Sequence, residues 1–176
     1  MNIIYGGLML LNAIKNRYSV RKFKDKPVEQ EKLDIILEAA RLAPSSCNTQ
    51  PWKFVVIRDE EKRKQLTEAC KGKQWVADAP VTIAICANNT DYVMTCGQLA
   101  YTIDASLAGE HICLQASELG LGTCWIGAFF HDKMAKIINL PDDYKIVGLL
   151  PLGYPDDEKG TRDLKPFNEV VVSDSF

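Results

Sequence analysis

Apolar residues recur at three- and four-residue steps between Glu29 and Leu42, and this spacing predicts an amphipathic helix that ends before Pro44. A shorter helix is predicted from about Leu10 to Asn16, and its end coincides with the start of the segment RYSVRKF. The apolar positions of the longer helix are Leu33, Ile36, Leu37, Ala40 and Leu42. The chain therefore begins with helical segments separated by a short basic stretch.

Compact runs of β-branched and apolar residues then predict strands. They lie at Trp52–Ile57, at VTIAICA after Pro80, and at KIVGLLPLG late in the chain, and a last run, Val170–Val172, follows the polar stretch DDEKGTRD. Helices are predicted after Arg58 and near Lys133–Asn139. Counting the apolar stretch TCWIGAFF, the pattern indicates about five helices and five strands, and an isolated run such as Val170–Val172 could pair with an edge of this subunit or of a partner.

The segment from about Tyr101 to Leu119 has apolar or small residues nearly all round, and Gly120 and Gly122 follow it as stop signals. A helix of that kind is buried on most sides. Its small residues would let a second helix approach closely, so we expect this helix at a subunit interface.

The length of 176 residues suits a single domain over residues 1–176, and the formal charge of -2 gives no reason to expect nucleic acid or an anionic membrane as partner. The apolar start, residues 1–14, lacks the preceding basic region of an export signal, and no run reaches the ~20 residues of a membrane span. The six cysteines form no CxxC pair and only two histidines accompany them, so no metal site is predicted. Cys86 and Cys113 lie in apolar contexts where reduced cysteines act as small hydrophobic residues, and free thiols suit a reducing cytoplasm.

The patterns of several common catalytic sites are absent. The glycines of GLGTCWIG stand at 120, 122 and 127 after a helix, whereas a dinucleotide-binding fingerprint follows a strand, and neither a GxxxxGK[ST] nor a GxSxG motif occurs. Two segments remain as candidates. In NRYSVRKF, Arg17, Arg21 and Ser19 could bind a phosphate through guanidinium and hydroxyl donors, although the local charge alone favours a solvated basic turn.

The second candidate is the loop from Pro44 to Trp52, which carries five polar side chains and Cys47 between two prolines. Proline limits backbone freedom, so such a loop can hold its donors in place for a heteroaromatic ligand. An ordinary helix-to-strand connection rich in turn formers is equally compatible with these residues.

Taken together and in order, these segments resemble the nitroreductase family of flavoenzymes. The resemblance rests on RYSVRKF, APSSCNTQPWKF, VADAPVTIAI, LGLGTCWIG and LLPLGYP, and it covers residues 10–172. It implies an α+β fold, a nitroreductase-like three-layer sandwich in which helices flank a mostly antiparallel five-stranded sheet. It also implies a homodimer with FMN at the subunit interface, in which the helix near 101–119 is central and the C-terminal strand over Val170–Val172 is exchanged with the partner.

The resemblance further assigns residues to the flavin. One subunit would supply Arg17, Tyr18, Ser19 and Arg21, and the other would supply Pro44, Ser45, Ser46 and Asn48. Backbone amides of Ile126 and Gly127 would lie beside the reactive edge of the ring. A late basic residue would reach the phosphate, and Arg162 is chosen over Lys159 and Lys165, although Leu164 stands where the family has an arginine. Gln74, with Lys73 as alternative, would add a contact.

The implied activity is oxidation of NAD(P)H followed by reduction of a nitroaromatic, quinone or related acceptor, with the hydride chemistry carried by FMN rather than by a catalytic side chain. Alternatives are a flavin-binding or flavin-storage protein without turnover and a flavin-dependent dehalogenase or dehydrogenase of the same fold. A thiol-based redox protein using Cys47, Cys96 or Cys124 is a further alternative, but no pair is spaced for thioredoxin-like exchange.

Overall fold

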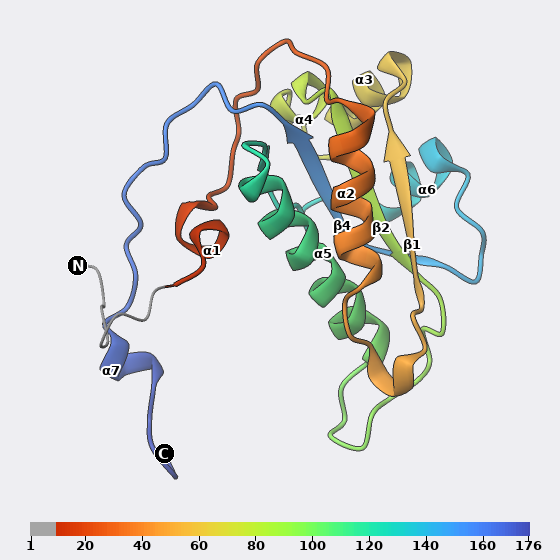
Figure 1. Ribbon diagram of the computed structural model, residues 1–176. Coiled ribbons are helices and arrows are strands. Elements are labelled where there is room, and N and C mark those ends of the chain that lie inside the picture. The colour runs from red at the N-terminus through yellow and green to blue at the C-terminus, as the bar shows by residue number, and fades with distance from the viewer. Residues whose placement is uncertain (1–9) are drawn as a thin grey trace.

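Four antiparallel strands form the central sheet of the protein (Figure 1). The computed structural model describes residues 10–176, and residues 1–9 of the apolar N-terminal stretch lie outside the described part. In the order β1-β2-β4-β3, the strands are β1 Trp52–Ile57, β2 Val81–Ala87, β4 Lys145–Gly153 and β3 Gly122–Thr123. The first three coincide with the apolar runs that predicted them.

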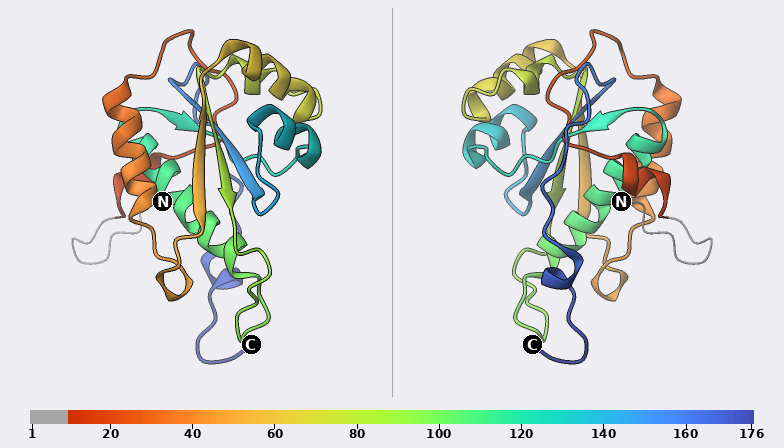
Figure 2. Two further views of the ribbon diagram at one scale, coloured as in Figure 1. Left: turned by 90° about the vertical axis from the view of Figure 1, so that its right-hand side faces the viewer. Right: turned by 90° about the vertical axis from the view of Figure 1, so that its left-hand side faces the viewer.

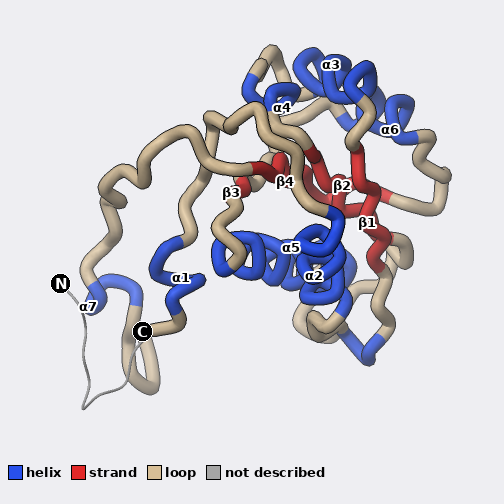
Figure 3. Tube along the Cα trace, turned by 45° about the horizontal axis from the view of Figure 1, so that its top comes forward, coloured by secondary structure: helices blue, strands red, loops and turns tan. Residues whose placement is uncertain are grey.

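Helices cover both faces of this sheet, which gives three layers (Figures 2 and 3). The helices α2 and α5 lie on one face and α1 packs against α5, whereas α3, α4 and α6 lie on the other face. A short helix, α7, lies on the C-terminal segment away from the sheet. Their bounds are α1 Asn12–Asn16, α2 Gln30–Arg41, α3 Glu60–Ala69, α4 Trp75–Asp78, α5 Ala100–Glu118, α6 His131–Ile138 and α7 Phe167–Val170.

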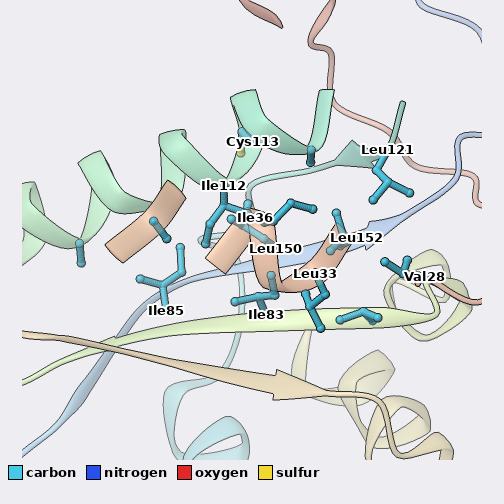
Figure 4. Packing of buried hydrophobic residues seen from close by; sticks show 14 of the residues in the cluster. Val28, Leu33, Ile36, Ile83, Ile85, Ile112, Cys113, Leu121, Leu150 and Leu152 are labelled. Carbon is cyan, nitrogen blue, oxygen red and sulfur yellow. The ribbon is translucent and has the colours of Figure 1, made fainter. Parts of the chain in front are cut away.

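The two cores follow from the two-residue period of the strands. Along β2, Ile83 and Ile85 point toward α2 and α5, whereas Ala84 and Cys86 point toward α3 and α6. Figure 4 shows the first of these cores, in which Ile112 of α5 and Leu33 of α2 pack over β2 and β4. Because both faces are covered, β2 is buried along its whole length and carries no alternating polar residues.

The prediction of a strand over Val170–Val172 is wrong for this chain by itself, so the described part has four strands instead of five. Val170 ends α7, and Val171 and Val172 are 45% and 55% exposed. A strand needs a neighbouring edge for its hydrogen bonds, and this segment lies on an arm that leaves the body after β4 (Figure 1). The exchange of this segment with a partner stays a prediction, and α4 and α7 are helices that the pattern did not predict.

The cysteines behave as the apolar contexts of Cys86 and Cys113 predicted. Both are buried, as is Cys70, and burial raises the pKa of each of these three thiols to about 11. Cys47 and Cys96 are exposed. Between Leu10 and Phe176, no helix combines the length and the apolar character that a membrane span requires.

Candidate functional site

The basic segment at Arg17–Arg21 runs along the outer edge of the sheet, next to β3. Ser19 pairs with Thr123 in a parallel bridge, and the Val20 N–H donates to the Thr123 carbonyl oxygen at 3.0 Å. Val20 is fully buried, and it packs where a Cβ on Gly122 would come within 2.3 Å of its Cγ2 atom. Gly122, which has no Cβ, therefore lets the basic segment lie directly against β3.

Asp157 organises the polar groups of this segment. Its carbonyl oxygen accepts the Tyr18 hydroxyl at 2.7 Å, and its carboxylate accepts the Arg21 N–H at 2.9 Å. Burial, and then the charge of Asp157, raise the pKa of Tyr18. The Arg17 guanidinium lies 3.5 Å from the Glu110 carboxylate on α5.

These contacts leave the Arg21 guanidinium and the Ser19 hydroxyl as the exposed donors of the basic segment. Arg21 makes one long contact, from Nη1 to the Ser19 carbonyl oxygen at 3.4 Å, and forms no ion pair in the described part of the chain. A guanidinium and a hydroxyl next to each other suit a phosphate group. Arg17 is half-buried beside Glu110, and the Tyr18 hydroxyl already donates to Asp157, so neither side chain is as available to a flavin as Arg21 and Ser19 are.

Ile126 and Gly127 lie farther along the same edge. The Ile126 N–H donates to the Leu149 carbonyl oxygen at 2.9 Å, so this amide is part of the sheet and is not free for a ligand. Gly127 is exposed, and a Cβ built on it would meet no atom within 4 Å. The structure thus narrows the predicted backbone contact to Gly127.

The residue before this pair, Trp125, lies between the sheet and α5 and remains 40% exposed. A Cβ on Gly109 of α5 would lie 2.4 Å from its Cζ3 atom, and a Cβ on Gly148 of β4 would lie 2.5 Å from its Cζ2 atom. Two glycines on different elements therefore make room for one indole ring. That ring stands two residues before Gly127 in the chain.

The other residues predicted to contact the flavin from the same subunit as Arg21 do not lie as close to the edge at β3. Gln74 precedes α4, where its amide donates to Asp78 at 3.3 Å, and the neighbouring Trp75 packs on the core beneath the basic segment. Arg162 lies exposed on the C-terminal arm, so the chain by itself does not bring it to the others. Of the two alternatives for Arg162, Lys159 contacts the Lys15 carbonyl oxygen and Lys165 is exposed.

The loop Pro44–Asn48 lies elsewhere, at the N-terminal end of α5 (Figure 1). Ser46 is bonded to Asp104 in the second turn of that helix, whereas Arg17 meets Glu110, which is about 9 Å farther along the axis and on a different face. Pro44 and Asn48 are exposed, and Ser45 is half-buried. One copy of the chain therefore does not unite the two predicted halves of the site.

Two residues that hold these halves were not singled out from the sequence. Asp157 stands in the polar stretch DDEKG, where nothing distinguishes it from its neighbours. Asp104 carried a usable signal, because it is an acid within an otherwise largely apolar helix and is only 2% exposed.

Comparison with known proteins agrees with the motifs and the fold. The model of the nitroreductase family matches residues 14–89 and 71–154. An FMN-dependent nitroreductase of Clostridium difficile R20291 is 34% identical, with a TM-score of 0.83 over 95% of this chain and 100% of that chain. A nitroreductase family protein of Clostridium novyi NT is 35% identical, with a TM-score of 0.78 over 82% of this chain and 84% of that chain. An FMN reductase [NAD(P)H] of Bacillus subtilis is 29% identical in an alignment that covers 95% of this chain and 74% of that protein.

Proposed function

This chain belongs to the nitroreductase family, and on that premise we propose that it is an FMN-dependent oxidoreductase that passes electrons from NAD(P)H to a nitroaromatic, a quinone or a related acceptor in a ping-pong reaction. We further propose that two copies form a homodimer and that each FMN lies between them.

One observation carries the proposal: candidate donors for a phosphate and for a flavin ring lie along a single edge of the sheet. Thr123, which pairs with Ser19, lies opposite Leu152, and Ile126 lies opposite Leu149. Three residues of β4 separate these points, which is roughly 10 Å. That separation suits a ligand whose phosphate and reactive ring lie at the two ends of a short polyol chain, as in FMN.

The donors fit this group chemically. FMN supplies the hydride chemistry when it is bound, and the protein contributes binding, orientation and access. The Arg21 guanidinium and the Ser19 hydroxyl hold the phosphate at one end of the edge. At the other end, the open backbone of Gly127 lets the ring approach the chain, and its N–H is a donor that does not titrate.

The second half of each site comes from the partner in this proposal. The loop Pro44–Asn48 contacts α5 farther along its axis than the basic segment and on a different face, and two copies that pack α5 against α5 would bring these halves together. Ile103 and Leu107 of α5 are 38% and 41% exposed and lie one turn apart, which leaves an apolar stripe for such packing.

The first test is an anaerobic titration of the purified protein with NADH and NADPH in the presence of FMN. We expect a yellow protein whose flavin absorbance bleaches rapidly on mixing with one of the two donors and returns when a quinone or nitroaromatic is added. A protein that stays colourless after incubation with FMN would overturn the proposal. An oxidised spectrum that persists with both donors would instead favour a flavin store.

Mixed dimers test the shared site. Arg21→Ala and Asn48→Ala should each weaken FMN binding in the homodimer, and Arg41→Ala, an exposed residue paired with Glu38 on α2, is the control. A dimer with Arg21→Ala in one copy and Asn48→Ala in the other contains one intact site if each site uses both subunits. It should then bind one FMN per dimer with wild-type affinity, whereas sites built within one subunit would leave no intact site.

A further inference from the structure

Asp104 is a buried acid on α5 that accepts hydrogen bonds from the loop Pro44–Asn48. It lies on α5 and is 2% exposed. Its Oδ1 atom accepts two hydrogen bonds from Ser46, one from the backbone N–H at 2.9 Å and one from the hydroxyl at 2.9 Å. Among the described residues, its Oδ2 atom is buried and has no hydrogen-bond partner.

The loop that Asp104 binds has an unfavourable backbone. Cys47, Asn48 and Gln50 have φ angles of 51°, 56° and 48°, which place three non-glycine residues in the left-handed region within four positions. Such a conformation persists only where surrounding contacts hold it. Within the loop, the Ser45 hydroxyl oxygen accepts the Gln50 N–H at 2.9 Å, but the two bonds to Asp104 attach it to a helix.

A hairpin-like segment, residues 92–99, covers the same place. The Ser46 hydroxyl lies 3.3 Å from the Met94 sulfur, and the charge of Cys47, followed by its hydrogen bond, raises the pKa of Tyr92. Asp104 thus lies under the point where the loop, this segment and α5 meet.

We propose that Asp104 is a positioning residue of the flavin site: by holding Ser46 through both of its donors, it fixes the strained loop Pro44–Asn48 in the shape that meets FMN of the partner subunit. This inference rests on the proposed function. It assigns to a residue that does not touch the flavin the task of ordering one half of its site in advance.

Stability alone gives little reason for an acid at this position. A buried carboxylate oxygen without a partner carries a desolvation penalty, and an apolar residue would avoid it. The charge does strengthen the two bonds to Ser46, because hydrogen bonds to an ionised acceptor are about twice as strong as neutral ones. The carboxylate therefore favours a rigid loop, although it leaves one buried oxygen without a partner in the described part of the chain.

The test compares Asp104→Ala with Asp104→Asn, whose amide oxygen can still accept both Ser46 bonds. Thr82→Val is the matched control, because Thr82 is fully buried, its hydroxyl also has no partner in the described part, and it lies in β2 away from the loop. Two quantities are measured: hydrogen exchange of the Ser46 amide in the protein without FMN, and the dissociation constant of FMN.

We expect Asp104→Ala to speed exchange of the Ser46 amide and to weaken FMN binding, each by about tenfold or more, which is the scale of losing a bond to a charged acceptor. Asp104→Asn should lie between Asp104→Ala and the wild type in both quantities, because its amide oxygen keeps the two bonds without the charge that strengthens them, and Thr82→Val should change neither. If Asp104→Ala does not fold, Asp104→Leu replaces it, because leucine keeps most of the side-chain volume and removes both acceptors.

The outcomes separate this inference from the proposed function. A wild-type protein that does not bind FMN would overturn both the function and the role of Asp104 in it. Wild-type FMN binding that Asp104→Ala leaves unchanged would overturn the positioning role alone. Equal losses in Asp104→Ala and Thr82→Val, without rescue by Asp104→Asn, would also overturn it, because a general loss of stability would then explain them.

Discussion

Replacing Gly148 by alanine tests whether the position of the Trp125 ring, which lies two residues before Gly127, matters for stability and for FMN binding. The new Cβ would lie 2.5 Å from Cζ2 and 2.8 Å from Cε2 of the indole ring, well inside ordinary contact distance. The ring has little room to move toward α5, because it already lies so close to the backbone of Gly109 that a Cβ built there would be 2.4 Å from its Cζ3 atom. Either the ring, which is 40% exposed, shifts toward solvent, or β4 and α5 move apart.

The expected cost is that of overpacking a core, about 1–3 kcal/mol. For a domain of this length, such a loss lowers the Tm by about 2–12 °C. Thermal unfolding followed by circular dichroism measures it. Because Gly127 is two residues from the displaced ring, FMN binding should weaken in the same variant.

A double-mutant cycle identifies the clash as the cause. The closest clashing atom, Cζ2, belongs to the outer ring of the indole, which a phenylalanine at this position does not reach, so Trp125→Phe should recover part of the stability in the Gly148→Ala background while costing stability by itself. We expect a favourable coupling of about 1 kcal/mol or more. Gly160→Ala is the control, because a Cβ there meets no atom within 4 Å. A Gly148→Ala protein as stable as the wild type, or strictly additive effects, would refute the reasoning.

Three further predictions concern the thiols and α4. Burial raises the pKa of three thiols from the ordinary value of 9.0 to about 11, so between these values the unfolded chain loses thiol protons that the folded chain keeps. The free energy of unfolding should therefore be constant in this respect below about pH 9 and fall between pH 9 and 11. Urea midpoints across this range should fall less steeply in Cys113→Ala. Arg63→Ala should cost about 1.5–3 kcal/mol in urea unfolding, because its guanidinium donates at 2.7 Å and 3.0 Å to two carbonyls at the end of α4, whereas the exposed Lys62→Ala should cost almost nothing. Cys47→Ser should keep steady-state reductase activity within about tenfold, and a larger loss would revive a thiol-based mechanism.

Local pattern was sufficient for the three long strands of the sheet and for the two segments of the site. The strands β2 and β4 are β-branched or apolar runs that both helical layers bury, and β1 is a mostly apolar, partly buried run at the edge of the sheet, so the runs themselves mark the strand ends. The prediction that the helix α5 is buried on most sides is not met within one chain, because one face is buried whereas Ile103 and Leu107 on the other face are exposed. The motifs RYSVRKF and APSSCNTQP lie on the sheet edge and on the loop after α2, and each retains exposed polar side chains.

What the sequence by itself determined was therefore most of the helices and the three long strands, the family and the residue types available to a flavin. Only the tertiary structure decided which of these groups are free. The Ile126 amide donates to Leu149, the Tyr18 hydroxyl donates to Asp157, and the segment Val170–Val172 is exposed and pairs with no strand in the described part of its own chain. It also revealed Asp104 beneath Ser46 and the slot that two distant glycines leave for Trp125. The physical reason is that periodicity and propensity act between near neighbours along the chain, whereas hydrogen-bond partners and close packing join residues that are far apart in sequence.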